Sequence, residues 1–117
     1  MASHHDLGKK GEQLAANFLL RKHYQILHIN WTSGKKEIDI IARQGGTLVF
    51  VEVKTRSTQF FGMPEEAVNG AKQELLLRAA EHYLEQYALQ PDCIRFDIIS
   101  VTLGVGGEEI VHFEDAF

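Results

Sequence analysis

Residues 36–56 read KEIDIIARQGGTLVFVEVKTR and contain most of the chemically informative side chains of this chain. Two runs rich in isoleucine and valine flank Gly45 and Gly46. Apolar runs separated by a glycine pair are typical of a β-hairpin with a tight turn. We therefore predict two strands that pair across Gly45 and Gly46.

Side chains along each predicted strand alternate between two faces. A hairpin can therefore bring Asp39, Glu52 and Lys54 together on one rigid surface. Two carboxylates and a lysine are the groups that a magnesium-dependent phosphodiesterase uses. The predicted faces are Glu37, Asp39 and Ile41 against Ile38, Ile40 and Ala42 in the first strand, and Phe50, Glu52, Lys54 and Arg56 against Val49, Val51 and Val53 in the second.

The same residues resemble the PD-(D/E)xK nuclease signature, with Asp39 as the D, Glu52 and Val53 as the E and the x, and Lys54 as the K. The resemblance implies a Mg²⁺ or Mn²⁺ ion held by Asp39 and Glu52, with the carbonyl of Val53 as a third ligand. Magnesium prefers oxygen ligands and keeps several waters, so few protein ligands suffice. Lys54 is expected to orient or deprotonate the attacking water and to stabilise developing negative charge.

Further motifs are spread along nearly the whole chain. They are Gly8-x-x-Gly11-Glu12, EIDIIA (37–42), VFVEVKTR (49–56), Gly62-x-Pro64-x-x-Ala67-Val68, Lys72, Arg95-Phe96-Asp97 and Ala116-Phe117. Together they resemble the YraN-type family of bacterial proteins. The resemblance implies a restriction-endonuclease-like α/β fold, related to archaeal Holliday junction resolvases. In that fold a mixed central sheet of about five strands is flanked by helices in three layers, in the order α-β-β-β-α-β-β.

The remaining elements follow from periodicity and from turn residues. A second helix is expected to bury a stripe that includes Leu75, Ala79 and Tyr83. The predicted ranges are a helix over 6–22, a strand over 23–31, a turn over 32–35, a helix from 64 or 65 to 87, a strand over 94–103, a turn over 104–107 and a short edge strand over 109–113.

Three further residues are candidates for the site. Glu12 follows Gly8 and Gly11, and each glycine costs a helix about 1 kcal/mol relative to alanine. The glycines indicate either a close approach to the sheet or a ligand, or a frayed first turn. Glu12 alone reads as a solvated charge, and the family resemblance makes it a candidate to support the metal site. Arg56 and Lys72 are candidate phosphate contacts, although a lone Lys72 also reads as a solvated lysine.

Length and composition predict a single domain over residues 1–117, and the family resemblance implies that this domain is nuclease-like. The net charge of −4 argues mildly against tight, non-specific binding to nucleic acid. No apolar run approaches the ~20 residues that span a bilayer. The N-terminus lacks the apolar segment of a signal peptide, and Cys93 is the only cysteine. We therefore expect a cytoplasmic protein without membrane contacts.

Two classes of function remain open. The first is a Mg²⁺-dependent DNA endonuclease that hydrolyses phosphodiesters in branched or damaged DNA, arranged as a homodimer like junction resolvases. The second is a nucleic-acid-binding or partner-binding module that keeps the nuclease fold without efficient catalysis. A carbohydrate hydrolase with paired carboxylates fits less well, because of Lys54 and the small size.

Several other residues allow two interpretations. Asp97 is either a further acidic site residue or a brace for the fold. Phe60 and Phe61 either stack on bases or form a small core patch. His23 and His28 lack the spacing of a metal site, so we expect ordinary strand histidines.

Overall fold

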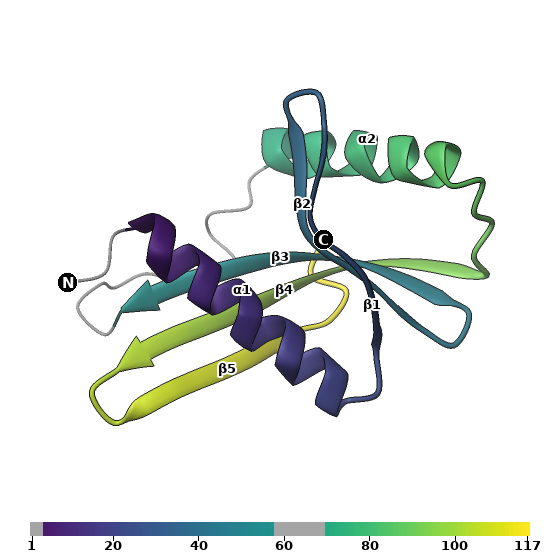
Figure 1. Cartoon of the computed structure of the whole chain (residues 1–117). Helices are drawn as coiled ribbons and strands as arrows, with labels where there is room; N and C mark the ends of the chain where they lie inside the picture. Colours follow the sequence, from purple (N-terminus) through teal and green to yellow (C-terminus); the bar gives the residue numbers. More distant parts are fainter. Residues whose placement is uncertain (1–3, 58–69) are drawn as a thin grey trace.

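The sheet has five strands in the order β1-β2-β3-β4-β5. The computed structural model describes residues 4–57 and 70–117, which form these strands and two helices. Their order along the chain is the predicted α-β-β-β-α-β-β. The elements are α1 (His4–Arg21), β1 (Gln25–Ser33), β2 (Lys36–Gln44), β3 (Thr47–Ser57), α2 (Gly70–Gln86), β4 (Cys93–Gly104) and β5 (Gly107–Phe113) (Figure 1).

Strand β3 is the centre of a mixed sheet. β1, β2 and β3 form antiparallel pairs, as do β4 and β5, whereas β3 and β4 run parallel. A parallel pair needs a long crossover connection, and α2 lies in that connection. The predicted mixed sheet is therefore confirmed. β3 pairs with β4 along its whole length and with β2 from Thr47 to Val51.

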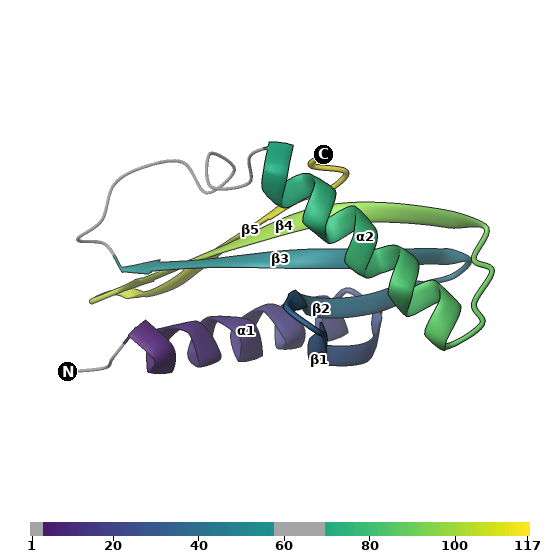
Figure 2. The ribbon, with the colours of Figure 1, turned by 90° about the horizontal axis from the view of Figure 1, so that it is seen from above.

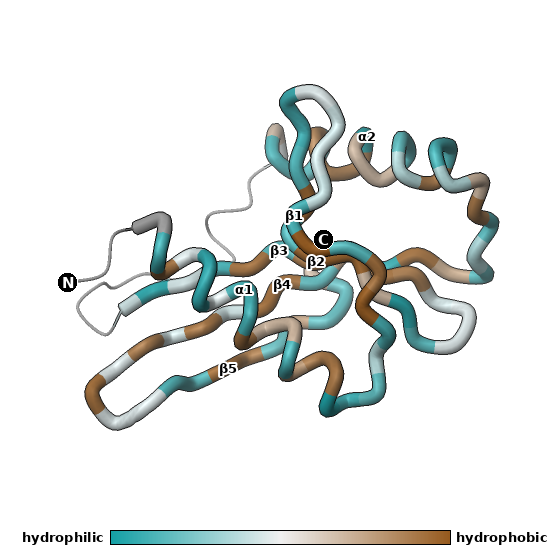
Figure 3. Tube along the Cα trace, in the orientation of Figure 1, coloured by the Kyte–Doolittle hydropathy of each residue, from teal (hydrophilic) through white to brown (hydrophobic). Residues whose placement is uncertain are grey.

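The two helices cover opposite faces of this sheet (Figure 2). Each helix packs on its own apolar cluster, and hydrophobic residues accordingly run along the central strands in Figure 3. The α1-face core contains Ala15, Ala16, Leu19, Tyr24, Ile40, Ala42, Val49, Val51, Ile99 and Val101. The α2-face core contains Trp31, Ile38, Ile41, Leu48, Phe50, Leu76, Ala79, Ala80, Tyr83 and Ile98.

Strand β2 departs from the strict alternation predicted for it. Ile40 and Ala42 pack in the α1-face core, whereas Ile38 packs in the α2-face core. The pairing of β2 with β3 extends only to Ile40 and Val51, and beyond this point the β1–β2 hairpin turns up beside α2 (Figure 1). The predicted face was wrong for Ile38 because the twist of the hairpin carries it to the other side of the sheet.

Helix α2 buries Ala79 and Tyr83 of the predicted stripe but leaves Leu75 outside it. Leu76, Ala79, Ala80 and Tyr83 are its buried residues, whereas Leu75 is 56% exposed. Consecutive leucines at this point fit more than one helical stripe, so periodicity could not choose between them. The prediction was therefore confirmed for Ala79 and Tyr83 and wrong for Leu75.

Some predictions fall outside the described residues. These are the beginning of the second predicted helix at 64–69 and the aromatic pair Phe60 and Phe61. Within the described parts of the chain, neither helix is long and apolar enough to cross a membrane.

Gly11 allows α1 to lie directly against β3. A Cβ atom at Gly11 would come within 1.8 Å of Thr55 Oγ1 and 2.8 Å of Thr55 Cβ, which no packing tolerates. A Cβ atom at Gly8 would meet nothing within 4 Å. The sequence allowed either a close approach or a frayed turn, and the close approach applies to Gly11 alone.

We expect Gly11→Ala to lower the free energy of unfolding by about 1–3 kcal/mol, because the added methyl group forces α1 away from Thr55. Gly8→Ala is the matched control in the same helix. It should be neutral or stabilise the protein by up to about 1 kcal/mol, because alanine favours helix over glycine. Urea unfolding compares the two variants, and equal effects would contradict the close packing at Gly11.

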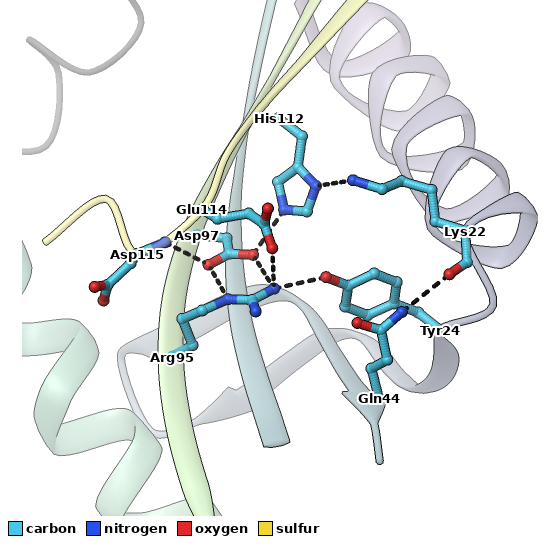
Figure 4. Close-up of polar contacts among 8 residues, drawn as sticks. All are labelled: Lys22, Tyr24, Gln44, Arg95, Asp97, His112, Glu114 and Asp115. Atoms are coloured by element: carbon cyan, nitrogen blue, oxygen red, sulfur yellow. Dashed lines mark hydrogen bonds and ion pairs between the residues drawn. The ribbon is translucent and has the colours of Figure 1, made fainter. Parts of the chain in front are cut away.

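Asp97 braces the end of the structure that contains the C-terminal residues (Figure 4). Its carboxylate is 0% exposed and accepts hydrogen bonds from Arg95 Nε and Nη2 at 2.9 Å, His112 Nε2 at 2.6 Å and the Asp115 backbone N–H at 2.9 Å. Lys22 Nζ donates to His112 Nδ1 at 3.0 Å, which leaves Nε2 to carry the proton toward Asp97.

These contacts also determine the ionisation of Asp97. Burial alone would raise its pKa, but the hydrogen bonds from His112, Arg95 and Asp115 outweigh burial and hold the pKa below its usual range. The network joins the end of α1 to β4, β5 and the residues after β5. The sequence left Asp97 as either a site residue or a residue that stabilises the fold. These contacts favour the stabilising role.

Asp97→Ala should lower the free energy of unfolding by about 3–5 kcal/mol, because Arg95 and His112 then lose their buried anion. The folded pKa of Asp97 lies below its unfolded value of about 3.9. This stabilisation is therefore complete above that pH and is lost as the pH falls through the folded pKa.

Denaturant unfolding at a series of pH values checks this expectation. Glu74→Ala is the control, because it removes only the exposed Arg78–Glu74 pair at 3.0 Å and should change stability by less than about 1 kcal/mol. A similar small loss for Asp97→Ala would contradict the bracing role.

Candidate active site

Glu52 is a buried carboxylate on the central strand. Its side chain is 8% exposed, and its Oε1 atom lies 3.1 Å from Lys54 Nζ and 2.5 Å from Lys72 Nζ. Lys54 follows on the same face of β3, whereas Lys72 reaches over from the first turn of α2. Two ammonium groups from different elements therefore balance one carboxylate.

Asp39 reaches the same strand through its backbone. Its Oδ2 atom accepts a hydrogen bond of 2.8 Å from the backbone N–H of Val53. Strand β2 pairs with β3 only as far as Ile40 and Val51. The N–H of Val53, the next one on this edge of β3, therefore donates to a side chain and not to a strand backbone. Asp39 is thus held at the point where β2 leaves β3, beside the residue between Glu52 and Lys54.

The surroundings of Asp39 favour its protonated form. Burial has the largest effect, and the negative charges of Glu52, Glu12 and Glu37 add to it, while the bond from Val53 acts in the opposite direction. The sum raises the pKa of Asp39 to about 7. Without a bound metal ion, the carboxylate of Asp39 therefore exchanges its proton near neutral pH.

Three carboxylates from α1 and β2 meet in one place. Ligand atoms of Glu12, Glu37 and Asp39 all lie within 4.8 Å of one another. Glu12 was a predicted member of the site, and Glu37 was not. The signal for Glu37 was present in the sequence, because alternation places it on the same face of the strand as Asp39.

Asn30 is a second residue that the sequence analysis missed. Its Nδ2 atom donates a 3.0 Å hydrogen bond to Glu12 Oε1. An asparagine inside a strand carries no sequence signal for such a contact. It adds β1 to the elements that surround the carboxylates.

The donor set suits a hard divalent cation. Such ions prefer carboxylate and carbonyl oxygens, which Glu12, Glu37, Asp39 and Glu52 provide. The N–H and C=O of one strand residue point to the same neighbouring strand, so the carbonyl of Val53 also points to the side of Asp39. Of the predicted ligands, Asp39 and Val53 are joined by a hydrogen bond, and Glu12 and Glu37 lie beside Asp39. Glu52 precedes Val53 on β3 and contacts the two lysines, so its place among the ligands stays a prediction.

The two lysines are perturbed in opposite directions. Burial, followed by the neighbouring Lys72, lowers the pKa of Lys54, although Glu52 acts against this. For Lys72, burial is likewise unfavourable to the charge, but the interaction with Glu52 outweighs it and raises the pKa. Lys54 is therefore the lysine that gives up its proton more readily.

The other predicted residues lie further from the carboxylates. Arg56 lies two positions beyond Lys54 on β3 and is partly exposed. His28 contacts the rings of Tyr83 and Tyr87, with centroids 5.3 and 5.0 Å away. These contacts fit the expectation that His28 is an ordinary strand histidine.

Comparison with known proteins identifies the family. A sequence model of the uncharacterised protein family UPF0102 matches residues 11–101. This chain belongs to that family. The resemblance to the YraN-type proteins is thereby confirmed, and the matched region contains all of the candidate site residues.

Curated bacterial relatives match along the whole of this chain. The chain is 46% identical to a UPF0102 protein of Christiangramia forsetii and 51% identical to one of Flavobacterium psychrophilum, in each case over 100% of this chain and 98% of the relative. It is 45% identical to a UPF0102 protein of Porphyromonas gingivalis, over 100% of this chain and 87% of the relative. These names state a family and no activity.

The raised pKa of Asp39 predicts an unusual pH dependence of stability. The folded state holds this proton more tightly than the unfolded state. Below about pH 4 Asp39 is protonated in both states, so it does not reduce stability. Above about pH 7 it is ionised in both states, and the folded state is destabilised by the full difference. In the presence of a chelator, the free energy of unfolding should therefore fall by a few kcal/mol, at ~1.4 kcal/mol per pKa unit, as the pH rises through this window.

Asp39→Asn keeps an acceptor for the N–H of Val53 but removes the charge. It should flatten the pH dependence and be about 1–3 kcal/mol more stable than the wild type at pH 8. Glu85→Gln, which changes an exposed carboxylate on α2, is the control. Parallel stability curves for the wild type and Asp39→Asn would contradict the repulsion inferred at this site.

Proposed function

We propose that this protein is a metal-dependent DNA endonuclease of the PD-(D/E)xK type. The observation that carries the proposal is the junction of Asp39 with the β3 segment Glu52-Val53-Lys54, where β2 leaves β3. An acidic residue and a Glu-x-Lys segment on neighbouring strands are the groups of the PD-(D/E)xK signature, and they can bind a divalent cation and activate a water for phosphodiester hydrolysis. The family resemblance extends the substrate class to branched or damaged DNA.

The carboxylates would hold Mg²⁺ or Mn²⁺. Asp39, Glu52 and the carbonyl of Val53 are the proposed ligands, and Glu12 and Glu37 lie beside Asp39. A bound divalent ion supplies charge stabilisation for the phosphoryl oxygens and a template for the substrate. The raised pKa of Asp39 fits this role, because a cation relieves the repulsion among the carboxylates.

Lys54 is the proposed base and charge stabiliser. A general base works best when its pKa lies near the operating pH, and burial lowers the pKa of Lys54 toward that range. Its Nζ atom is held by Glu52, so the amine remains in one position. Deprotonated, it can accept a proton from an attacking water; protonated, it can stabilise the negative phosphoryl group.

Lys72 and Arg56 are the proposed phosphate contacts. Lys72 extends across Glu52 from α2, and its raised pKa keeps it charged. Arg56 continues the same face of β3 beyond Lys54. A phosphodiester that approaches the carboxylates would pass between these cations, which offsets the repulsion between DNA and the acidic groups.

One observation favours the alternative, a binding module that retains the nuclease fold. Lys54 and Lys72 already balance the charge of Glu52 through two ion pairs. A carboxylate neutralised by lysines forms a stable structure with or without turnover. A measurement of DNA cleavage therefore distinguishes the endonuclease from the binding module.

We expect the protein to cleave DNA in the presence of Mg²⁺ or Mn²⁺ and not in the presence of a chelator. Single-stranded, duplex, flap and four-way-junction DNA, each end-labelled, form the substrate panel. Lys54→Met should lower the cleavage rate by about 100-fold or more, because it removes the proton acceptor while keeping an unbranched side chain.

Lys35→Met is the matched control, since Lys35 is an exposed lysine in the β1–β2 turn. Its cleavage rate should equal that of the wild type. A folded wild-type protein that cleaves none of these substrates with either metal would shift the function to the binding module. Equal activity of Lys54→Met would indicate a contaminating nuclease.

A further inference from the structure

Asn30 has a backbone conformation that is rare in a strand. Its φ angle is +54°, in the left-handed region, although it lies within β1. Asparagine is among the few residues besides glycine that adopt this region at modest cost. Such conformations outside turns mark places where the surrounding structure imposes them, and they concentrate at functional sites.

Asn30 lies opposite Asp39. The neighbouring pairs along the β1–β2 ladder are Ile29 with Ile40 and Trp31 with Ile38, which leaves Asn30 and Asp39 facing each other. The hairpin changes sides here, because Ile40 belongs to the α1-face core whereas Trp31 and Ile38 belong to the α2-face core. The left-handed Asn30 therefore lies at the point where the hairpin twists from one face of the sheet to the other.

The side chain of Asn30 contacts the candidate site. Its Nδ2 atom donates to Glu12 Oε1 at 3.0 Å, and ligand atoms of Glu12 lie within 4.8 Å of those of Glu37 and Asp39. Carboxylates this close repel one another, so an unrestrained Glu12 would rotate into solvent. The amide of Asn30 is a neutral donor that holds it without cancelling its charge.

We propose that Asn30 is a positioning residue for the metal site. Its amide orients the carboxylate of Glu12, and its left-handed backbone turns β2 so that Asp39 lies beside Val53. This inference rests on the proposed function. It assigns a role to a residue that cannot itself be a strong ligand, and it explains why an asparagine stands in the middle of this strand.

Two substitutions separate the backbone from the amide. Asn30→Gly keeps the left-handed conformation, which glycine adopts readily, and removes only the hydrogen bond to Glu12. Asn30→Ala removes the hydrogen bond and also strains the backbone. The matched control is His23→Gly, because His23 is another left-handed residue (φ +69°) and follows the end of α1, away from the carboxylates.

The experiment measures Mn²⁺ binding by calorimetry and thermal unfolding in a chelator for the same proteins. Asn30→Gly should bind Mn²⁺ about 10-fold more weakly, as expected when a partner of a metal ligand is removed. It should unfold at the wild-type temperature or above. His23→Gly should retain wild-type affinity, and Asn30→Ala should lose both affinity and stability.

A double-mutant cycle with Glu12→Ala tests the route of the effect. On the Glu12→Ala background, Asn30→Gly should cause no further loss of affinity, because its partner is already absent. Wild-type affinity in Asn30→Gly, or an equal loss on both backgrounds, would overturn the positioning role while leaving the metal site intact. If the wild type shows no Mn²⁺ binding that depends on Asp39 and Glu52, the proposed function fails, and the role of Asn30 fails with it.

Discussion

Burial of a carboxylate on the central strand constrains the rest of this structure. An isolated charge in such a place costs several kcal/mol, and Glu52 is only 7% exposed to solvent. Compensation comes from Lys54 on the same strand and from Lys72 on α2, and both reach one oxygen atom. The placement of α2 over the sheet is therefore linked to the chemistry of the strand beneath it. The ion pairs of Glu52 with Lys54 and Lys72 stabilise the buried charge, and the same ion pairs hold the lysines in the proposed site.

Strand periodicity was sufficient to predict the centre of the fold. The apolar runs on either side of Gly45 and Gly46 predicted the β2–β3 hairpin, because a tight turn leaves few alternatives. Alternation also predicted that Glu52 and Lys54 share a face. That part of β3 runs regularly in register with β4, so local geometry and tertiary geometry agree.

Prediction failed where neighbouring elements decide the local geometry. Ile38 changed faces because the β1–β2 hairpin twists after leaving β3, and the sequence of one strand does not encode where its partner ends. Leu75 and Leu76 are equivalent by periodicity, and only packing on the sheet selects Leu76. The left-handed backbone of Asn30 lies at the same twist, and periodicity gives no sign of it. Glu37 lay on the predicted face, but nothing local showed that α1 would bring Glu12 against it.

The parallel pairing of β3 with β4 has a consequence for synthesis of the chain. Its register joins Thr47 with Cys93 and Ser57 with Leu103, so one edge of β3 stays open until the second half of the chain has left the ribosome. An open, valine-rich edge is a template for pairing with other nascent chains. The charges that follow along β3, from Glu52 to Arg56, oppose such pairing in the way that gatekeeper residues do. The charged end of this strand is thereby suited to protect the unfinished protein from aggregation until β4 covers the open edge.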